Sequence, residues 1–226
     1  NAWTNRPHPA VTANPAEFLA AKPVSPRRWE MIGFAVLVAI LSGSVLFGAP
    51  LGAMMFRSDA VAAGEWWRIL THPFVHITWY HLLLDASAFF LLYHGLLENK
   101  LSRRLLYVVA GAAGSLGLSW LAAPAITTQG LCGLSGIAHG LMAVSAVEMM
   151  RGNARSTAEW KIGVFTFAIV VGKAAWEAIS GHVLFEFLYF NMVGSPITIS
   201  HAGGIVGALL AALLLRQRRV SYPGNP

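Results

Sequence analysis

Charged residues are scarce in this sequence. Asp, Glu, Lys and Arg together make up 12% of the 226 residues, whereas 56% of the residues are hydrophobic. A soluble domain of ordinary composition carries about 25% charged residues. So little charge excludes an ordinary soluble domain and indicates a chain whose solvent is largely lipid.

Cysteine is almost absent, and the basic residues do not form a patch. A single cysteine, Cys132, excludes an internal disulfide and a metal centre built on several cysteines. The net charge of +6 could suggest a nucleic-acid partner. The basic residues instead fall at the ends of apolar runs, so we expect no nucleic-acid binding.

Long apolar runs dominate what is present. A helix needs about 20 mostly apolar residues to cross about 30 Å of hydrocarbon. None of the runs alternates polar and apolar residues as the strands of a membrane barrel would. The first run is too long for a signal-peptide core and is interpreted as an anchor. We therefore predict an all-α membrane protein with six transmembrane helices, at roughly 31–49, 80–97, 104–123, 134–150, 162–180 and 200–215.

The connection between the first two runs is long and aromatic. Residues 50–79 include Trp66, Trp67 and Trp79, and such amphipathic rings prefer the headgroup level of a membrane. We expect this loop to lie in the interface as short helices. The predicted organisation is an N-terminal tail over 1–28, a membrane domain over 29–217 and a C-terminal tail over 218–226.

Lys and Arg are distributed unevenly between the two sets of loops. One set holds thirteen of them and the other holds two, and cytoplasmic loops carry the excess. Both termini are therefore predicted to be cytoplasmic, with loops 50–79, 124–133 and 181–199 on the outer side. The thirteen are Arg6, Lys22, Arg27, Arg28, Lys100, Arg103, Arg104, Arg151, Arg155, Lys161, Arg216, Arg218 and Arg219; the two are Arg57 and Arg68.

A few polar residues interrupt the apolar runs. Such groups are costly inside a bilayer and by default mark function. Three pairs at i, i+4 share a helix face. The residues are His81, Asp85, His94, Ser135, His139, Lys173, Glu177 and His201.

Ser135 is the candidate nucleophile, and it needs a base within hydrogen-bond reach. Histidine is the usual base, and two are candidates. His139 lies on the same helix, which fixes its geometry relative to Ser135. His201 lies on a separate run, at a similar predicted depth, followed by glycines that would let the helices approach closely. We favour His201.

Together these motifs resemble the rhomboid intramembrane serine proteases. The resemblance covers about residues 31–215 and is carried by several motifs in order. These are Gly133-Leu134-Ser135-Gly136, His201-Ala202-Gly203-Gly204, Trp67-Arg68 followed by Thr71, Phe74 and His76, and His81-Leu82-Leu83-Leu84-Asp85.

The resemblance implies a Ser135–His201 dyad without an orienting carboxylate. It also implies that His81, residue 85 and the backbone around Gly133 and Gly136 stabilise the oxyanion. Residue 85 departs from the family, which has Asn there. An ionised Asp85 would repel a developing oxyanion, so it could help only if protonated or by orienting His81.

His139 and the stretch 172–177, GKAAWE, resemble the bacterial rhombosortase subgroup. That resemblance implies an inner-membrane location in a bacterium. It also implies, as substrate, a transmembrane protein with a C-terminal Gly-Gly sorting tail. No cofactor is implied.

Other interpretations of the same residues stay open. The glycines are also typical of helix packing. Lys173 and Glu177 are most simply a buried ion pair, His139 could link its helix to Glu177, and Trp67 and Arg68 could anchor and brace the loop. A metal at the histidines is disfavoured. The rival functions are a catalytically inactive rhomboid-like binding partner, which Asp85 favours, and a small transporter, against which no repeat is found.

Overall fold

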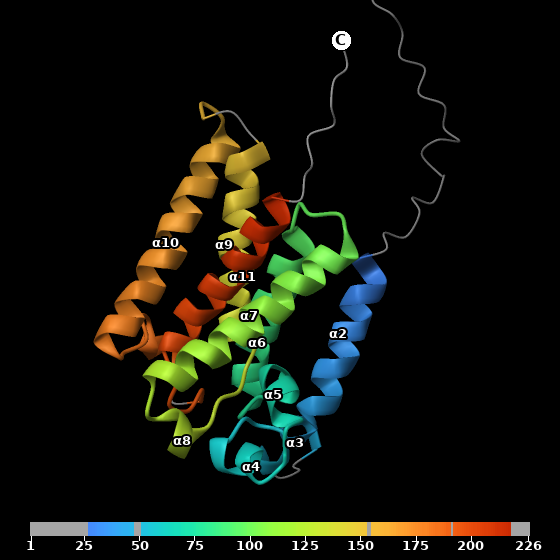
Figure 1. Cartoon of the computed structure of the whole chain (residues 1–226), viewed down its shortest axis with the longest axis vertical. Coiled ribbons are helices and arrows are strands. Elements are labelled where there is room, and N and C mark those ends of the chain that lie inside the picture. The colour runs from blue at the N-terminus through green and yellow to red at the C-terminus, as the bar shows by residue number, and fades with distance from the viewer. Residues whose placement is uncertain (1–26, 48–50, 153–154, 191, 218–226) are drawn as a thin grey trace, which may run out of the picture.

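The computed structural model describes residues 27–47, 51–152, 155–190 and 192–217, and within them every regular element is a helix (Figure 1). An isolated backbone bridge joins Phe56 and Leu131. The longer helices are α2 (Arg27–Leu41), α6 (Trp79–Gly95), α7 (Leu101–Ala122), α9 (Ser135–Gly152), α10 (Ala158–Ser180) and α11 (Ile199–Gln217). The shorter ones are α3 (Gly43–Phe47), η1 (Leu51–Ala53), α4 (Ser58–Ala62), α5 (Arg68–Thr71), η2 (His72–Phe74), α8 (Ile126–Gln129) and η3 (Glu186–Tyr189).

A long helix lies in each of the six predicted runs, but not all of them are long enough to span a bilayer alone. By length and composition α7 and α10 qualify, and a third span results if α5 and η2 form one bent unit with α6, at 90°. Ile199–Leu215 is a shorter apolar helix. Over the residues that the structure describes, the chain is therefore all-helical with two to three clear apolar spans, and six spans remain a prediction.

The first run is not one continuous helix, contrary to expectation. α2 ends at Leu41 and α3 begins at Gly43. Between them the Ser42 hydroxyl bonds to the Phe74 carbonyl at 2.9 Å and to His76 Nδ1 at 3.0 Å. These bonds tie the break to the segment that precedes α6. α2 also begins at Arg27, inside the predicted tail, while the rest of both predicted tails lies outside the described residues.

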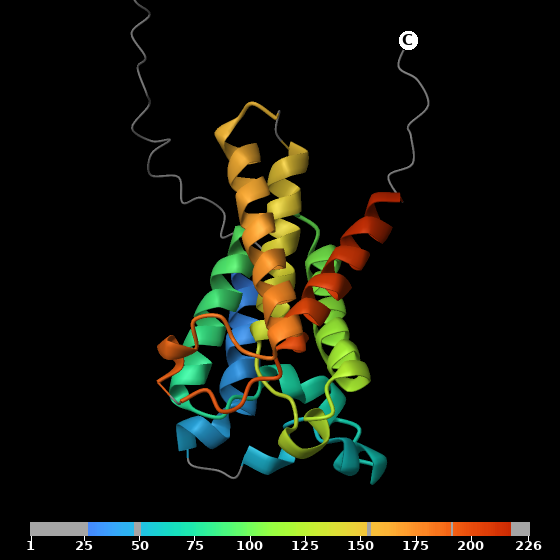
Figure 2. The same cartoon turned by 90° about the vertical axis from the view of Figure 1, so that its left-hand side faces the viewer.

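The short helices gather at one end of the bundle. In both views α3, α4, α5 and α8 lie at the end where α9 and α11 begin, and the connection from α9 to α10 lies at the opposite end (Figures 1 and 2). Because Ser135 begins α9 and His201 lies in the first turn of α11, the two residues share that end. Loop 50–79 does fold largely as short helices; its position in a membrane interface remains a prediction.

Close backbone contact joins α9, α7 and α11. A Cβ built on Gly204 of α11 would overlap the carbonyl group of Gly136 on α9, and one on Gly207 would overlap the carbonyl of Ala110 on α7. Only glycine permits this approach, which is typical of small-residue interfaces between membrane helices. It brings the first turns of α9 and α11, and thus Ser135 and His201, to neighbouring positions.

Candidate active site

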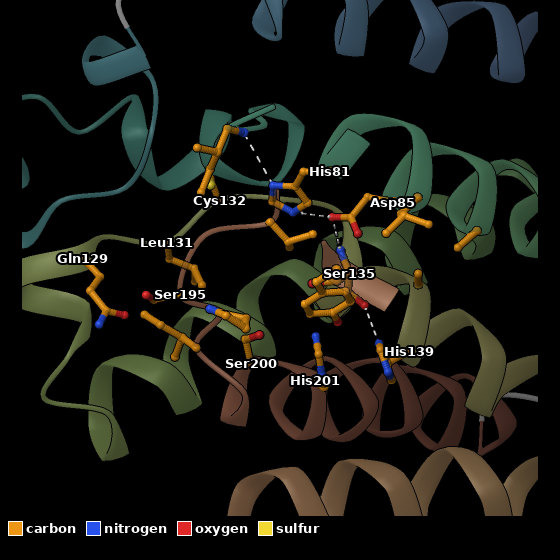
Figure 3. Close-up of a pocket in the computed structure, with 18 of the residues that line it drawn as sticks. His81, Asp85, Gln129, Leu131, Cys132, Ser135, His139, Ser195, Ser200 and His201 are labelled. Atoms are coloured by element: carbon orange, nitrogen blue, oxygen red, sulfur yellow. Dashed lines mark hydrogen bonds and ion pairs between the residues drawn. The ribbon is translucent and has the colours of Figure 1, made fainter. Parts of the chain in front are cut away.

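A cavity of about 280 Å³ lies where the first turns of α6, α9 and α11 meet (Figure 3). Side chains far apart in the sequence line it. They include His81 and Asp85 from α6, Ser135 and His139 from α9, Lys173 from α10 and His201 from α11. The helices thus bring most of the polar residues singled out in the sequence to one place.

Local backbone geometry sets the position of Ser135. Gly133 has φ of +102°, and a Cβ there would lie 2.7 Å from Asp85 Oδ2 and 2.8 Å from His81 Nε2. Glycine is therefore required both by the conformation and by the space. α9 then begins at Ser135, whose backbone N–H donates to Asp85 Oδ2 at 3.0 Å.

Thr78 positions the histidine and the aspartate of α6. Its side chain accepts from the His81 N–H at 3.1 Å and so caps the start of the helix. His81 and Asp85, one turn apart, then point the same way, with His81 Nε2 3.2 Å from Asp85 Oδ2. The Ile77 N–H donates to His81 Nδ1 at 3.4 Å, so neutral His81 carries its proton on Nε2 and donates it to Asp85.

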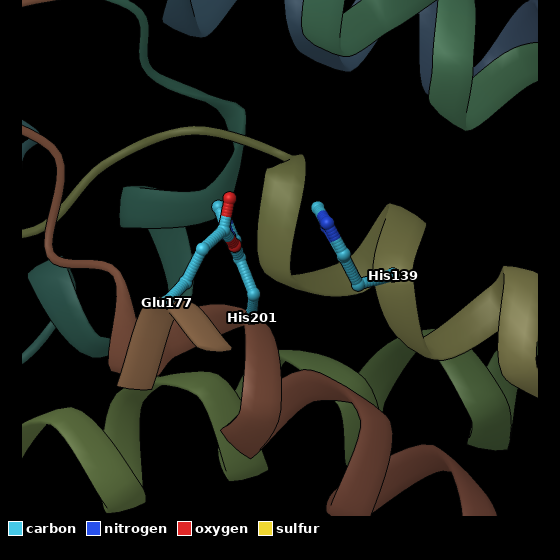
Figure 4. Close-up of side chains that lie close together, drawn as sticks. All are labelled: His139, Glu177 and His201. Atoms are coloured by element: carbon cyan, nitrogen blue, oxygen red, sulfur yellow. The ribbon is translucent and has the colours of Figure 1, made fainter. Parts of the chain in front are cut away.

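His139 and His201 stack against each other. Their ring centroids are 4.0 Å apart and their planes differ by 10° (Figure 4). His139 Nδ1 lies 2.8 Å from the Ser135 carbonyl oxygen, and its Nε2 lies 3.0 Å from Lys173 Nζ. A carbonyl only accepts and an ammonium only donates, so His139 is neutral with its proton on Nδ1. Both nitrogens of His139 are engaged, which leaves it unsuited to act as a base.

His201 has a different set of partners. Its Nδ1 lies 2.7 Å from Glu177 Oε2, and both side chains are buried. Within the described part of the chain, no hydrogen bond reaches His201 Nε2, and none joins His201 to the Ser135 hydroxyl. Catalytic hydrogen bonds are often long or absent before substrate binds. The free nitrogen of His201 is thus the one available to serve as a base for Ser135 in their shared cavity.

Comparison with known proteins gives the family. The family described as "Rhomboid domain" matches residues 63–218. The chain belongs to the rhomboid family. No curated protein matches the sequence. Rhomboid proteins are integral membrane proteins, generally serine proteases that act on transmembrane substrates, and the matched range contains every site residue predicted above. The predicted rhomboid resemblance is therefore confirmed; membership of the rhombosortase subgroup remains a prediction.

The rhomboid's loop residues brace its fold outside the cavity. Arg68 is buried and donates to Glu65 Oε2 at 2.7 Å, to the Met55 carbonyl at 2.8 Å and to the Gly52 carbonyl. Trp67 Nε1 donates to the Ala53 carbonyl at 3.1 Å. These contacts fold residues 52–68 onto themselves, which fits a bracing role for Arg68.

Two residues behind Asp85 complete the site: sequence reasoning named His76 only as part of the loop motif, and it missed Ser42. His76 Nε2 lies 3.6 Å from Asp85 Oδ2 and is buried without a hydrogen-bond partner among the described residues. Because the single Ser42 hydroxyl proton goes to the Phe74 carbonyl, His76 Nδ1–H must donate to Ser42. In neutral His76 the other nitrogen, Nε2, then carries no proton. A hydrogen bond between His76 Nε2 and Asp85 Oδ2 therefore requires either a protonated, cationic His76 or a protonated Asp85. Ser42 gave no signal in the sequence, because it stands alone in an apolar run.

Two other features of the rhomboid's site have simple explanations. Cys132 lines the cavity, but burial raises the pKa of its thiol to about 12, so the thiol stays protonated and unreactive. Ligand atoms of His139, Glu177 and His201 lie within 4.8 Å of one another, as in a metal site. The Lys173 ammonium already contacts His139 and Glu177 Oε1 (2.6 Å) and supplies the positive charge there. We assign no metal.

Proposed function

We propose that this rhomboid is a serine endopeptidase that cleaves transmembrane segments near the outer membrane face, with Ser135 as nucleophile and His201 as general base. One observation supports this most directly. Ser135 and His201, from different helices, line one cavity, and one ring nitrogen of the histidine has no hydrogen-bond partner among the described residues. The alternative base, His139, has neither nitrogen free.

The proposed reaction is an acyl transfer to Ser135 followed by hydrolysis of the acyl ester. His201 Nε2 takes the proton of Ser135 Oγ as that oxygen bonds to the scissile carbonyl carbon, whose oxygen becomes an oxyanion. Collapse of this intermediate breaks the C–N bond, and the imidazolium returns its proton to the leaving amine. Water, activated in turn by His201, then hydrolyses the acyl ester and frees Ser135. The Ser135 N–H and His81 Nε2–H both face Asp85 Oδ2 in the structure, and in the proposed reaction they turn to the oxyanion as its donors.

The substrate would reach the cavity from the side of α6 and α10. Leu84 and Ala88 of α6 and Lys173 of α10 line it, and the segment between α10 and α11 contributes Leu188 and Tyr189. A substrate helix must unwind there to expose its carbonyl, so helix-breaking residues are favoured. The rhombosortase resemblance makes a C-terminal Gly-Gly-tailed membrane protein the substrate to try first, in the inner membrane of a bacterium with both termini of the protease cytoplasmic.

The test uses purified protein reconstituted in lipid vesicles with model transmembrane substrates, one of them Gly-Gly-tailed. Ser135→Ala and His201→Ala should abolish cleavage. The matched controls are Ser195→Ala, another serine lining the cavity, and His182→Ala, an exposed histidine. Both controls should cleave at the wild-type rate. Equal cleavage by Ser135→Ala and wild type would refute the proposal.

A catalytically inactive rhomboid is the second candidate, and Asp85 is the observation that favours it. The carboxylate holds the Ser135 N–H that an oxyanion would need. A fluorophosphonate probe separates the two, because Ser135-dependent labelling supports the enzyme and a blank supports a binding role. If Asp85→Asn switches on labelling in a silent protein, the native protein is inactive.

A further inference from the structure

We propose that Glu177 is a positioning residue for His201, so that the reacting unit is Ser135–His201–Glu177. This inference rests on the proposed function and adds a carboxylate to it. The rhomboid resemblance implied a dyad without such a group. The structure places Glu177 Oε2 2.7 Å from His201 Nδ1.

The two oxygens of Glu177 have separate partners. Oε1 accepts from Lys173 Nζ at 2.6 Å and from the Leu184 N–H at 3.0 Å, whereas Oε2 accepts from His201. Three donors from α10, the following loop and α11 therefore fix the plane of the carboxylate. Since Glu177 is fully buried, it has little freedom to leave His201.

These partners determine which nitrogen of His201 carries the proton. An ionised carboxylate accepts only, so His201 donates from Nδ1 and keeps a lone pair on Nε2. That is the tautomer a general base needs, and a buried carboxylate performs this task in the triads of soluble serine proteases. Glu177 also stabilises the imidazolium that forms when the proton leaves Ser135.

Lys173 stabilises the buried Glu177 carboxylate, and His139 connects Lys173 to His201 and Ser135. Burying an unpaired carboxylate is strongly unfavourable, and the ammonium of Lys173 compensates its charge. The same ammonium donates to His139, whose ring stacks on His201 and whose Nδ1–H bonds to the Ser135 carbonyl. The chain of contacts thus links the carboxylate, the base and the backbone of the nucleophile.

The simplest competing explanation is a structural ion pair between Lys173 and Glu177. Glu177→Gln and Lys173→Met both break that pair, so they form a matched comparison. Lys173→Met leaves Glu177 free to accept from His201. Glu177→Gln does not, because turning its amide oxygen toward His201 would aim the amide hydrogens at Lys173 and the Leu184 N–H. The oxygen therefore turns toward those donors, and the amide donates to His201 Nδ1 and forces the wrong tautomer.

The kinetic experiment compares both variants with wild type on the same substrate in vesicles. We expect Glu177→Gln to lower kcat at least about 100-fold, with KM within about threefold, because the group acts on the base rather than on binding. Lys173→Met should lower kcat clearly less than Glu177→Gln does, because it removes the charge compensation but leaves the carboxylate that accepts from His201 in place. Thermal unfolding of each variant shows how far the ion pair contributes to stability. Equal losses of kcat in the two variants would overturn the inference and leave an ion pair only.

A readout independent of substrate is the tautomer of His201, measured by ¹⁵N NMR of histidine-labelled protein and assigned with His201→Gln. Wild type should show a proton on Nδ1 and a bare Nε2, and Glu177→Gln should show the reverse. The opposite tautomer in wild type refutes the inference even if no variant folds. If Ser135→Ala and wild type are equally silent while NMR shows Nδ1–H, the proposed function fails but the positioning of His201 by Glu177 stands.

Discussion

The contact between α9 and α11 provides the sharpest test of the fold that places the site. Gly204→Ala adds a methyl group where the Gly136 carbonyl group already lies. The obstacle is backbone rather than a flexible side chain, so it cannot rotate away. Gly117→Ala in α7 is the matched control, because no atom of the described residues lies within 4 Å of the added Cβ there.

The expected magnitude follows from these surroundings. Alanine has a better helix propensity than glycine by about 1 kcal/mol, and this gain applies to both variants. Overpacking typically costs about 1–3 kcal/mol, and more when backbone must move. Gly117→Ala should therefore be neutral or slightly stabilising. The free energy of unfolding of Gly204→Ala should be lower than that of Gly117→Ala by about 3 kcal/mol or more, because backbone must move.

The same substitution should also act on catalysis. Gly204 follows His201 by one turn of α11, and Gly136 directly follows Ser135. Separating the helices displaces the proposed base, His201, from the proposed nucleophile, Ser135, and a displacement of about 1 Å can lower a rate about 100-fold. Thermal unfolding in micelles and cleavage in vesicles measure the two effects. Equal unfolding temperatures and rates in both variants would refute the close contact, and with it the placement of His201 beside Ser135.

Three further predictions follow from the contacts of single residues. His139→Phe keeps a flat ring against His201 and should lower kcat by no more than about tenfold, whereas a loss as large as that of His201→Ala would make His139 the base. Cys132 should react slowly with iodoacetamide at pH 8, because its thiol has a pKa of about 12, and the rate should rise with pH; rapid labelling at neutral pH would contradict the raised pKa. Arg68→Lys should lower the unfolding temperature, with a cost of about 1 kcal/mol or more, because the buried guanidinium loses bonds to the Gly52 and Met55 carbonyls, which are only partly buried, while Arg57→Lys, an exposed pair, should change little.

Periodicity and spacing predicted much of this arrangement. Lys173 and Glu177, four residues apart on one helix, do form an ion pair, as their spacing indicated. The shared end of Ser135 and His201 followed from counting apolar runs, because each residue begins a run on the same side. Such inferences succeed because they depend only on helix geometry and chain direction.

Contacts between helices could not be predicted in the same way. The sequence suggested that His139 could bond to Glu177, but Lys173 lies between them and bonds to both. The pairing of His201 with Glu177 depends on how α10 and α11 rotate against each other, which no spacing reveals. Ser42 was hidden for a related reason, since its partners Phe74 and His76 lie more than 30 residues away.

The occupied amide of Ser135 has a consequence for inhibitor chemistry. A compound that leaves a negative charge beside the serine, such as a tetrahedral boronate, must compete with the built-in anion Asp85 for the same N–H. Acylating agents meet this competition only while the tetrahedral oxyanion forms, because their stable adduct is neutral. Selective blockers of this protein should therefore come from neutral ester- or carbamate-forming chemistry, and Asp85→Asn should restore sensitivity to the boronate.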